Sequence, residues 1–226
     1  RRQRQMCIET AYALPEESRS GIVYAGNLGI NRITPLVSLG RALKEAAIAG
    51  FETIHVYSGE RNPAILQQLK EENGLTYCGR IPAQEVERVL GASKFIIFTE
   101  AFDRSSICRT KYSLSTKIAE SLRSGACILA YGPDEIASID YLKQHHSACI
   151  LREAGELPGT VQRLCAAPEE YRAYTQSARS LAEQFHSAEC NETRMKEILA
   201  EAIRNFQLYE HGGYICLLYT SPSPRD

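Results

Sequence analysis

Residues Lys111-Tyr-Ser-Leu-Ser-Thr-Lys-Ile-Ala-Glu-Ser-Leu-Arg-Ser-Gly-Ala-Cys-Ile-Leu-Ala-Tyr-Gly-Pro133 join a polar loop, a short helix and an apolar strand in direct succession. The helix is expected from Thr116 to Ser124, because apolar residues recur on one face at three- and four-residue steps. Ser115 or Thr116 can cap its start, and Gly125 can end it. The apolar run that follows has the length of a buried strand.

Lys117 lies in the first turn of this helix, where a cation opposes the helix dipole by about 0.3–1 kcal/mol. An anionic ligand at the amide-rich helix start would reverse the sign, so a bound phosphate would explain both the Ser-Thr pair and the lysine. The alternative is an exposed pair with Glu120, three residues further on, worth about 0.2–0.5 kcal/mol. Taken alone, the segment leaves both interpretations open.

The same succession of strand and helix repeats along the chain. Strands are predicted at residues 21–25, 53–57, 75–78, 95–98, 127–131 and 148–151. Helices are predicted at residues 33–49, 63–72, 84–90, 116–124 and 135–145. Four glycines, Gly50, Gly74, Gly91 and Gly125, stand where helix ends favour a left-handed residue. The pattern predicts an α/β fold with a doubly wound, Rossmann-like parallel sheet of about six strands and a C-terminal helical extension.

The chain divides into four parts. Residues 1–20 are expected to be an entering linker, residues 21–190 the Rossmann-like domain, residues 191–207 an amphipathic helix and residues 208–226 a disordered tail. The apolar stripe of that helix can pack on its own domain or on a missing partner domain, and the sequence favours neither. The last eleven residues, 216–226, match one reading frame of a transposon-end sequencing adaptor. We therefore expect an artefact there and a gene fragment overall, and Arg1 in place of an initiating Met agrees.

Composition restricts the possible partners. The 226 residues include 26 basic and 27 acidic side chains, for a net charge of −1. This balance gives no reason to expect nucleic acid or an anionic membrane, so any anion must be recognised locally. The apolar runs are far shorter than the roughly 20 residues of a membrane span. The eight cysteines show no Cys-x-x-Cys spacing and are expected to be reduced core thiols of a cytoplasmic protein.

Ligands of doubly wound sheets bind beyond the carboxyl ends of the strands, where strand order reverses. The loop after the first strand offers Gly26 and Gly29, which let backbone approach a ligand, and a cation, Arg32. It lacks the Gly-x-Gly-x-x-Gly spacing of dinucleotide binders. A tight turn and a solvated charge are the alternatives for these residues.

The loop after the fourth strand brings Glu100 and Asp103 to the same crevice. Asp103 is as easily explained as a solvated loop carboxylate. Arg32, Lys117 and two helix starts would converge there, which is enough positive potential for a diphosphate. A nucleotide fits this arrangement better than a single phosphate.

Three motifs carry a family resemblance: Tyr24-Ala-Gly-Asn-Leu-Gly29 with Arg32, Tyr77-Cys-Gly-Arg-Ile-Pro82, and Ser115 to Gly125 followed by Ile128-Leu-Ala-Tyr-Gly-Pro133. Over roughly residues 20–207 the chain resembles the C-terminal, nucleotide-sugar-binding domain of GT-B glycosyltransferases, specifically the family 4 retaining type. The resemblance implies one half of a GT-B architecture.

The resemblance also implies roles for single residues. In that family two cations of the first loop hold the donor diphosphate. Here Asn27 replaces the first of them, and Arg32 occupies the position of the second. The family's Glu-x₇-Glu motif places its second carboxylate, which binds the donor ribose, at Glu120. Its first carboxylate would fall at Tyr112, and Glu100 is the candidate catalytic substitute. The diphosphate-binding residues would be Gly26, Asn27, Gly29, Arg32, Ser115, Thr116 and Lys117, and Arg80 and Ile81 would lie near the base.

The expected function is the donor half of a retaining glycosyltransferase. It would transfer a sugar from a nucleotide diphosphate sugar to a glycan or lipid-linked acceptor, with no metal or other cofactor. The N-terminal acceptor domain would be missing, so the fragment would bind nucleotide without turnover. The location would be cytoplasmic, with any attachment to the inner membrane made by the missing domain. The alternatives are a nucleotide-sugar epimerase of the same fold and a non-catalytic nucleotide-binding or scaffold domain.

Overall fold

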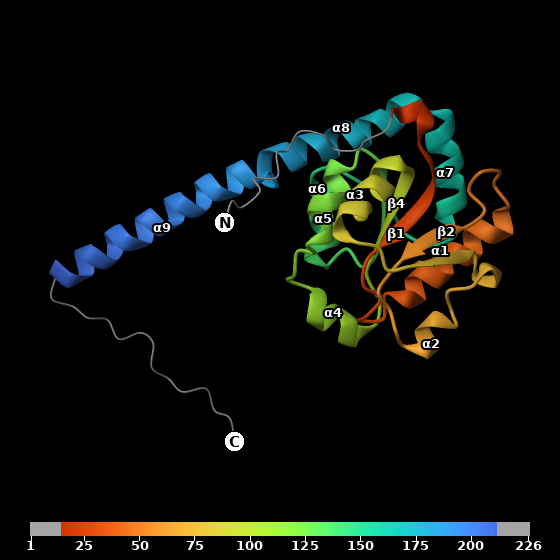
Figure 1. Ribbon diagram of the computed structural model, residues 1–226, viewed down its shortest axis with the longest axis horizontal. Coiled ribbons are helices and arrows are strands. Elements are labelled where there is room, and N and C mark those ends of the chain that lie inside the picture. Colours follow the sequence, from red (N-terminus) through yellow and green to blue (C-terminus); the bar gives the residue numbers. More distant parts are fainter. Residues whose placement is uncertain (1–14, 212–226) are drawn as a thin grey trace, which may run out of the picture. The chain divides into compact units, whose positions relative to one another are not determined.

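A computed structural model describes residues 15–211 of the chain. They form two units, one that extends to Glu183 and one that begins at Gln184. The first unit contains a six-stranded, all-parallel sheet with the order β3-β2-β1-β4-β5-β6 (Figure 1). The strands are β1 (Ser20–Ala25), β2 (Ile54–Tyr57), β3 (Leu75–Gly79), β4 (Ser93–Thr99), β5 (Cys127–Tyr131) and β6 (Cys149–Leu151). The predicted parallel α/β sheet is confirmed.

Helices connect the strands and continue after the last one. They are η1 (Glu16–Ser18), α1 (Ile33–Ala46), α2 (Pro63–Leu66), η2 (Glu71–Asn73), α3 (Ala83–Ala92), α4 (Arg104–Thr110), α5 (Lys117–Arg123), α6 (Ala137–Gln144), α7 (Glu156–Ala166), α8 (Pro168–Phe185) and α9 (Ala188–His211). Every predicted strand is present within two residues of its expected bounds, because each is a short apolar run between turn residues. Helix α9 covers the amphipathic segment predicted at residues 191–207 and continues to His211.

Strand order reverses beside β1, which pairs with β2 on one side and β4 on the other. Ile22 of β1 pairs with Ile54 of β2 and with Phe95 of β4. Because all strands run in the same direction, the loops after β1 and β4 leave the sheet at one edge. This is the reversal point that the sequence predicts for the ligand crevice.

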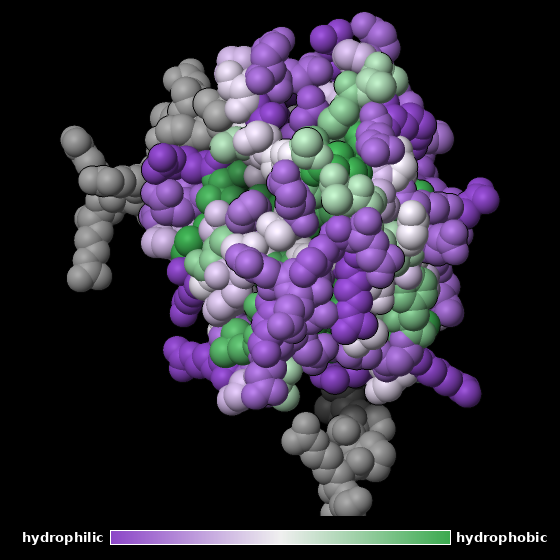
Figure 2. All heavy atoms as spheres, turned by 90° about the vertical axis from the view of Figure 1, so that its right-hand side faces the viewer, coloured by the Kyte–Doolittle hydropathy of each residue, from purple (hydrophilic) through white to green (hydrophobic). Residues whose placement is uncertain are grey.

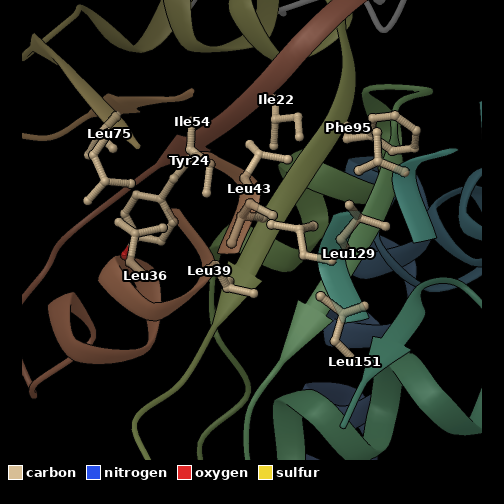
Figure 3. Packing of buried hydrophobic residues seen from close by; sticks show 14 of the residues in the cluster. Ile22, Tyr24, Leu36, Leu39, Leu43, Ile54, Leu75, Phe95, Leu129 and Leu151 are labelled. Carbon is tan, nitrogen blue, oxygen red and sulfur yellow. The ribbon is translucent and has the colours of Figure 1, made fainter. Parts of the chain in front are cut away.

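Both faces of the sheet are covered around β4 and β5, which explains why these strands are nearly continuous apolar runs, whereas β2 alternates between buried and exposed residues. On one face, α1 packs its leucines against the central strands (Figure 3). The labelled side chains of that cluster are Ile22, Tyr24, Leu36, Leu39, Leu43, Ile54, Leu75, Phe95, Leu129 and Leu151. Fully burying such a side chain contributes about 1.5–3 kcal/mol. On the other face, α5 and α6 cover β4 and β5. The side of the molecular surface that Figure 2 shows is largely hydrophilic, with hydrophobic residues in small separate areas.

Glycine marks two of the four predicted helix ends and misses the other two. Gly50, Gly74 and Gly125 all adopt positive φ as expected, but only Gly74 and Gly125 stand at the end of a helical element. Helix α1 stops at Ala46, and Ala47 takes the left-handed conformation, because its N–H bonds back to the carbonyls of the last turn. Helix α3 continues through Gly91 to Ala92 and passes directly into β4. The assignments of Gly50 and Gly91 as helix ends were therefore wrong.

The helix predicted at residues 63–72 is also wrong in extent. Asn62 caps a single turn through the N–H of Ala64, and α2 ends at Leu66. Leu69 then turns into the core, and Asn73 donates to the carbonyl of Gln68 from the following 3₁₀ turn. Burial of Leu69 outweighs continuation of an exposed helix. Helices α4 and α7 were not predicted.

Two glycines let the backbones of α1 and η2 touch. A Cβ at Gly74 would lie 1.9 Å from the carbonyl oxygen of Gly40, and a Cβ at Gly40 would lie 2.3 Å from that of Asn73. Neither contact leaves space for a methyl group. Lys44 and Arg41 of the same helix add hydrogen bonds to the η2 segment. The second half of helix α1 is thus held against η2, while its first turn lies at the crevice.

Cysteine placement differs in part from the expectation of core thiols. Cys127 and Cys149 are buried on adjacent strands, but Cys108, Cys165 and Cys190 are exposed. All three lie on helices, where apolar neighbours in sequence can belong to the opposite face. Cys7 and Cys216 lie outside the described residues. Within residues 15–211, no helix combines the length and the apolar composition needed to cross a membrane.

Candidate functional site

A cleft of about 440 Å³ opens at the carboxyl edge of the sheet, between the β1–α1 loop and the segment that leads into α5. Six of its lining residues, Gly26, Asn27, Arg32, Ser115, Thr116 and Lys117, are among the predicted diphosphate-binding residues, and a seventh is the predicted catalytic Glu100. Gly29 does not line the cleft but bonds to two residues that do: its N–H donates to the side chain of Asn27, and its carbonyl oxygen accepts from Nη1 of Arg32 at 3.4 Å. Thr110, Ser113 and Leu114 complete the lining.

Arg32 and Glu100 form a bidentate ion pair at the base of this cleft. The Nε and Nη2 groups of Arg32 donate to the two carboxylate oxygens of Glu100 at 2.9 and 3.1 Å. The Glu100 side chain is 2 % exposed and that of Arg32 is 13 % exposed. Paired forks of this kind are the strong class of charge-assisted hydrogen bonds, and losing one partner leaves a buried charge. Glu100 is therefore committed to orienting Arg32.

Lys117 is the second cation of the cleft and lies among aromatic rings. Its Nζ donates to the hydroxyl of Tyr24 at 3.3 Å and lies 4.9 Å from the centre of the Tyr24 ring. The ring centre of Phe98 is 5.8 Å away. Burial, with a smaller contribution from the positive charge of Arg32, lowers the pKa of Lys117 to about 8, against the opposing influence of Glu100 and Glu120. The exposed helical pair with Glu120, considered from the sequence, is not the position that Lys117 adopts.

Gly26 gives Lys117 the space it occupies. The backbone of Gly26 has φ of 153°, and a Cβ there would lie 2.5 Å from Cδ and 2.8 Å from Nζ of Lys117. The Gly26 N–H bonds to the carbonyl of Tyr57, which fixes the loop at the end of β1. The glycine is required because a lysine from another helix crosses directly over it, which a tight turn alone would not explain.

Tyr24 supports the lysine from the core below. Its hydroxyl donates to the carbonyl of Asn27 at 2.7 Å while it accepts from Lys117. Burial raises the pKa of Tyr24 far above its usual range, so the hydroxyl stays neutral and keeps its proton for Asn27. The tyrosine belongs to the core cluster of Figure 3 and was not predicted to take part in the site. Its place as the penultimate residue of β1, directly below the loop, is the signal that could have identified it.

The β1–α1 loop holds two consecutive residues other than glycine in the left-handed region, Ile30 with φ of 57° and Asn31 with φ of 53°. Asparagine tolerates this conformation, but a β-branched residue is an outlier there, at about 1–2 kcal/mol. The Asn27 side chain accepts a bond from the N–H of Gly29 and tightens the turn before them. Contacts of its neighbours therefore hold Ile30 in this conformation.

Asp103 connects this loop to the start of α4. One of its carboxylate oxygens accepts a hydrogen bond from Nδ2 of Asn31 at 2.9 Å, and the other caps α4 through the N–H of Ser106 at 3.0 Å. The Asn31 bond, followed by those of Ser106, lowers the pKa of Asp103 to about 2. Asp103 is thus solvent-exposed, as the alternative of a solvated loop carboxylate expects, but it also makes two specific hydrogen bonds.

The predicted caps at the start of α5 are absent. Thr116 occupies the N-cap position with helical φ and ψ and makes no side-chain capping bond. The N–H of Ser115 instead donates to Oγ of Ser138 at 2.9 Å, and that hydroxyl donates to the carbonyl of Ser113. Helix α6 thus fixes the segment before α5. Ser115 and Thr116 line the cleft without serving as caps.

Comparison with known proteins identifies the architecture. No protein-family model matches the chain, and no curated protein sequence matches it. Among solved structures, sucrose-phosphate synthase from Thermosynechococcus elongatus matches over 85 % of this chain, with a TM-score of 0.61 and 14 % identity. The chain has the fold of one half of a GT-B glycosyltransferase. The match spans 47 % of the synthase chain, so the chain covers about half the length of that protein.

Two further matches agree with this GT-B half. The C-terminal domain of LpcC, a glycosyl transferase group 1 family protein from Francisella tularensis, aligns over 75 % of this chain and 87 % of its own, with a TM-score of 0.54 and 12 % identity. Anabaena HepE, solved in complex with UDP and glucose, aligns over 82 % of this chain and 49 % of its own, with a TM-score of 0.62 and 13 % identity. At these identities the likeness concerns the fold alone.

The remaining residues carried over from the GT-B resemblance lie outside the cleft lining. Glu120 is exposed on the first turn of α5, close enough to Lys117 to influence its pKa. Arg80 and Ile81 follow β3, two strands from β1, and the Arg80 side chain lies 3.5 Å from where a Cβ of Gly59 would stand. Tyr112 is 89 % exposed. The ribose and base contacts assigned to these positions stay predictions.

The cleft therefore combines two cations with one carboxylate that is already engaged. The net charge of this group is positive at neutral pH, and the charged end of Lys117 faces a tyrosine hydroxyl. Such a cleft favours an anion with several oxygens, because each cation can donate hydrogen bonds to one of them. Among residues 15–211, no group of three His, Cys, Asp or Glu side chains is arranged to hold a metal ion.

Proposed function

We propose that this chain is the donor-binding half of a retaining glycosyltransferase that uses a nucleotide diphosphate sugar and a glycan or lipid-linked acceptor. The observation that carries the proposal is Lys117, a half-buried cation that projects into the cleft of a GT-B half. No carboxylate within residues 15–211 forms an ion pair with it, and burial together with the nearby positive charge of Arg32 disfavours its charged form. A bound anion would remove that penalty.

In this proposal the diphosphate lies between Lys117 and Arg32. Charge develops on the leaving diphosphate as the sugar departs, and fixed cations stabilise that charge more than they stabilise the bound donor. Glu100 acts by holding the guanidinium of Arg32 in place, which changes its proposed role from catalytic carboxylate to positioning residue. The positive charge comes from side chains, and the proposal includes no metal or other cofactor.

The other half of the enzyme would supply the acceptor site. We propose that the present chain binds nucleotide but does not transfer sugar by itself, because groups that bind the acceptor belong to the domain it lacks. Glu120 would bind the ribose, and Arg80 and Ile81 would lie near the base.

Isothermal calorimetry with UDP, ADP and GDP tests the proposed site. The unmodified chain should bind at least one of the three, and Lys117→Ala should weaken that binding by at least about tenfold, since it removes a charge-assisted contact. Lys111→Ala is the matched control, because Lys111 is an exposed lysine that pairs with Glu135. Its affinity should stay within about twofold of the unmodified chain. Equal, tight binding by Lys117→Ala would refute the diphosphate site.

One observation favours a second candidate, a nucleotide-binding domain without catalysis. Tyr112, at the position where the family resemblance implies a carboxylate, is exposed and carries no negative charge. The two functions differ in the full-length protein. Glycosyl transfer by that protein with any nucleotide sugar would exclude the non-catalytic domain, whereas nucleotide binding without transfer would favour it.

A further inference from the structure

Two separate polar contacts join the β1–α1 loop to the residues that follow β4. One is the ion pair of Arg32 with Glu100, and the other is the bond of Asn31 with Asp103. We infer that Asn31, held by Asp103, is a positioning residue that sets the direction of Arg32 in the cleft. This inference rests on the proposed function, because Arg32 is there a ligand of the donor diphosphate.

The backbone conformation of Asn31 determines where the next residue, Arg32, lies. Asn31 directly precedes Arg32, and both Asn31 and Ile30 are in the left-handed region. Isoleucine favours leaving that region, and such a relaxation would change the path of the backbone that leads into Arg32. A contact that opposes this relaxation must act on the loop at or next to Ile30. The side chain of Asn31 makes such a contact.

Both ends of the Asn31 amide are engaged, so its orientation is fixed. Nδ2 donates to Asp103 at 2.9 Å, and Oδ1 accepts from the hydroxyl of Thr34 at 2.7 Å. Thr34 lies in the first turn of α1, and its N–H also bonds the Asn31 carbonyl. The amide therefore links the start of α4, through Asp103, to the start of α1.

Asp103 is a firm anchor for this link. Its second oxygen receives the N–H of Ser106, so the carboxylate is part of the α4 helix start and not a mobile loop group. Helix α4 continues to Thr110, which lines the cleft. The same anchor thus fixes one wall of the cleft and the loop that presents Arg32.

The geometry of Arg32 explains why this support matters for binding. Two of its nitrogens are used by Glu100, and Nη1 is directed to the carbonyl of Gly29, so a phosphate must meet the remaining N–H groups of a guanidinium held in one plane. A small rotation of the loop would misdirect them. Displacements of about 1 Å at such a site can reduce rates about 100-fold.

A double-mutant cycle with UDP as probe tests the inference. Calorimetry would compare the unmodified chain with Asn31→Ala, with the neutral pair Arg32→Gln/Glu100→Gln, and with the triple substitution. Asn31→Ala alone should weaken UDP binding about tenfold, which is about 1.4 kcal/mol. In the neutral-pair background it should add less than about twofold. An equal loss in both backgrounds would overturn the inference, because a general structural effect would not depend on Arg32.

The reciprocal exchange Asn31→Asp/Asp103→Asn gives a second readout. It restores one donor and one acceptor between the two positions, and asparagine remains a good helix cap. Asn31→Asp alone brings two carboxylates together and should weaken UDP binding, while the exchange should recover affinity to within about threefold of the unmodified chain. Failure of the exchange to recover affinity, in a protein whose thermal unfolding is unchanged, would also overturn the inference. Asp134→Ala is the matched control, since that exposed carboxylate pairs with Lys143.

The same measurements separate this inference from the proposed function. If the unmodified chain fails to bind UDP, ADP and GDP, the donor site itself is refuted and the inference with it. If the unmodified chain binds UDP and Asn31→Ala binds it equally well, only the positioning role is refuted.

Discussion

Arg32 and Lys117 line one cleft, but the protein surrounds them in opposite ways. Arg32 enters from the loop before α1 and is neutralised by a buried carboxylate through two hydrogen bonds. Lys117 enters from the first turn of α5 and meets a tyrosine hydroxyl and two aromatic rings. The first cation is compensated within the fold, and the second keeps a lowered pKa because burial is not compensated.

The two cations therefore have opposite effects on folding free energy. The paired Arg32 stabilises the folded state, whereas the charge of the unpaired Lys117 destabilises it. An ion pair with a buried partner is destabilising to break, since a charge is left without compensation. A desolvated lysine without a carboxylate partner is destabilising to keep. We expect function to depend most on the second kind, and the following substitutions test that expectation.

The largest effect is expected for Glu100→Ala, which leaves the guanidinium of Arg32 buried without its partner. Such losses cost about 3–5 kcal/mol of folding free energy. Urea denaturation would measure the change, with Glu135→Ala as control. The control breaks the exposed pair of Glu135 with Lys111 and should cost less than about 1 kcal/mol. Similar losses for both variants would contradict the larger contribution of the buried pair to folding free energy.

Gly26→Ala should act on the other cation. The new methyl group would stand 2.5 Å from Cδ of Lys117, so the lysine must leave its place over the glycine. We expect weaker UDP binding and a loss of about 1–3 kcal/mol in folding free energy, because φ of 153° at Gly26 is a backbone conformation that residues with a side chain rarely adopt. Gly155→Ala, where a Cβ would meet nothing within 4 Å, provides the comparison. Unchanged UDP affinity in Gly26→Ala would show that the position of Lys117 is unimportant.

Lys117→Met should stabilise the fold, in contrast to Glu100→Ala and Gly26→Ala. It replaces a desolvated ammonium by an apolar chain of similar length among Tyr24 and Phe98, so the fold should gain about 1–3 kcal/mol at pH 7, one pKa unit being about 1.4 kcal/mol. Nucleotide binding should weaken in the same protein. Thermal unfolding and calorimetry on one sample measure both. A variant that loses stability would refute the view of Lys117 as a cost to the fold.

The smallest effect concerns pH. Because the pKa of Lys117 falls from 10.5 to about 8 in the folded chain, its penalty is fully present below pH 8 and disappears as pH rises towards 10.5. Relative to Lys117→Met, the unmodified chain should thus gain stability over this interval. Its affinity for UDP should decline over the same interval as the lysine loses its charge. Parallel pH profiles in the two proteins would contradict this assignment.

The strands and the crevice could be predicted from sequence because they follow from local pattern. Each strand is a short apolar run, and a parallel sheet must bring the loops after its central strands to one edge. The position of Lys117 in this crevice needed only its place in the first turn of a helix that follows β4. For this reason the fold and the place of the two cations could be predicted from the sequence.

The contacts that organise the cleft could not be predicted from the sequence. Arg32 and Glu100 are 68 residues apart, and either could have been a solvated charge until the sheet joined them. Asn31 and Asp103 are 72 residues apart, and nothing in the residues near Asn31 indicates a left-handed backbone. Helix α4 lacks a clear apolar period, so its cap at Asp103 was overlooked. Helix α7 did carry a signal, Leu157, Val161 and Leu164 on one face, with Pro158 tolerated in its first turn.

The contact between Gly40 and Gly74 gives this architecture a mechanical consequence. Helix α1 is seated against η2 with no side chain between the two backbones, so it has no freedom to slide, and its first turn follows directly from Arg32. In Gly40→Ala the new methyl group would push the middle of α1 away from η2, and this shift of the helix would change the direction of the Arg32 guanidinium at its start. The direction of the Arg32 guanidinium is thus set, in part, by Gly40 and Gly74, two residues without a side chain.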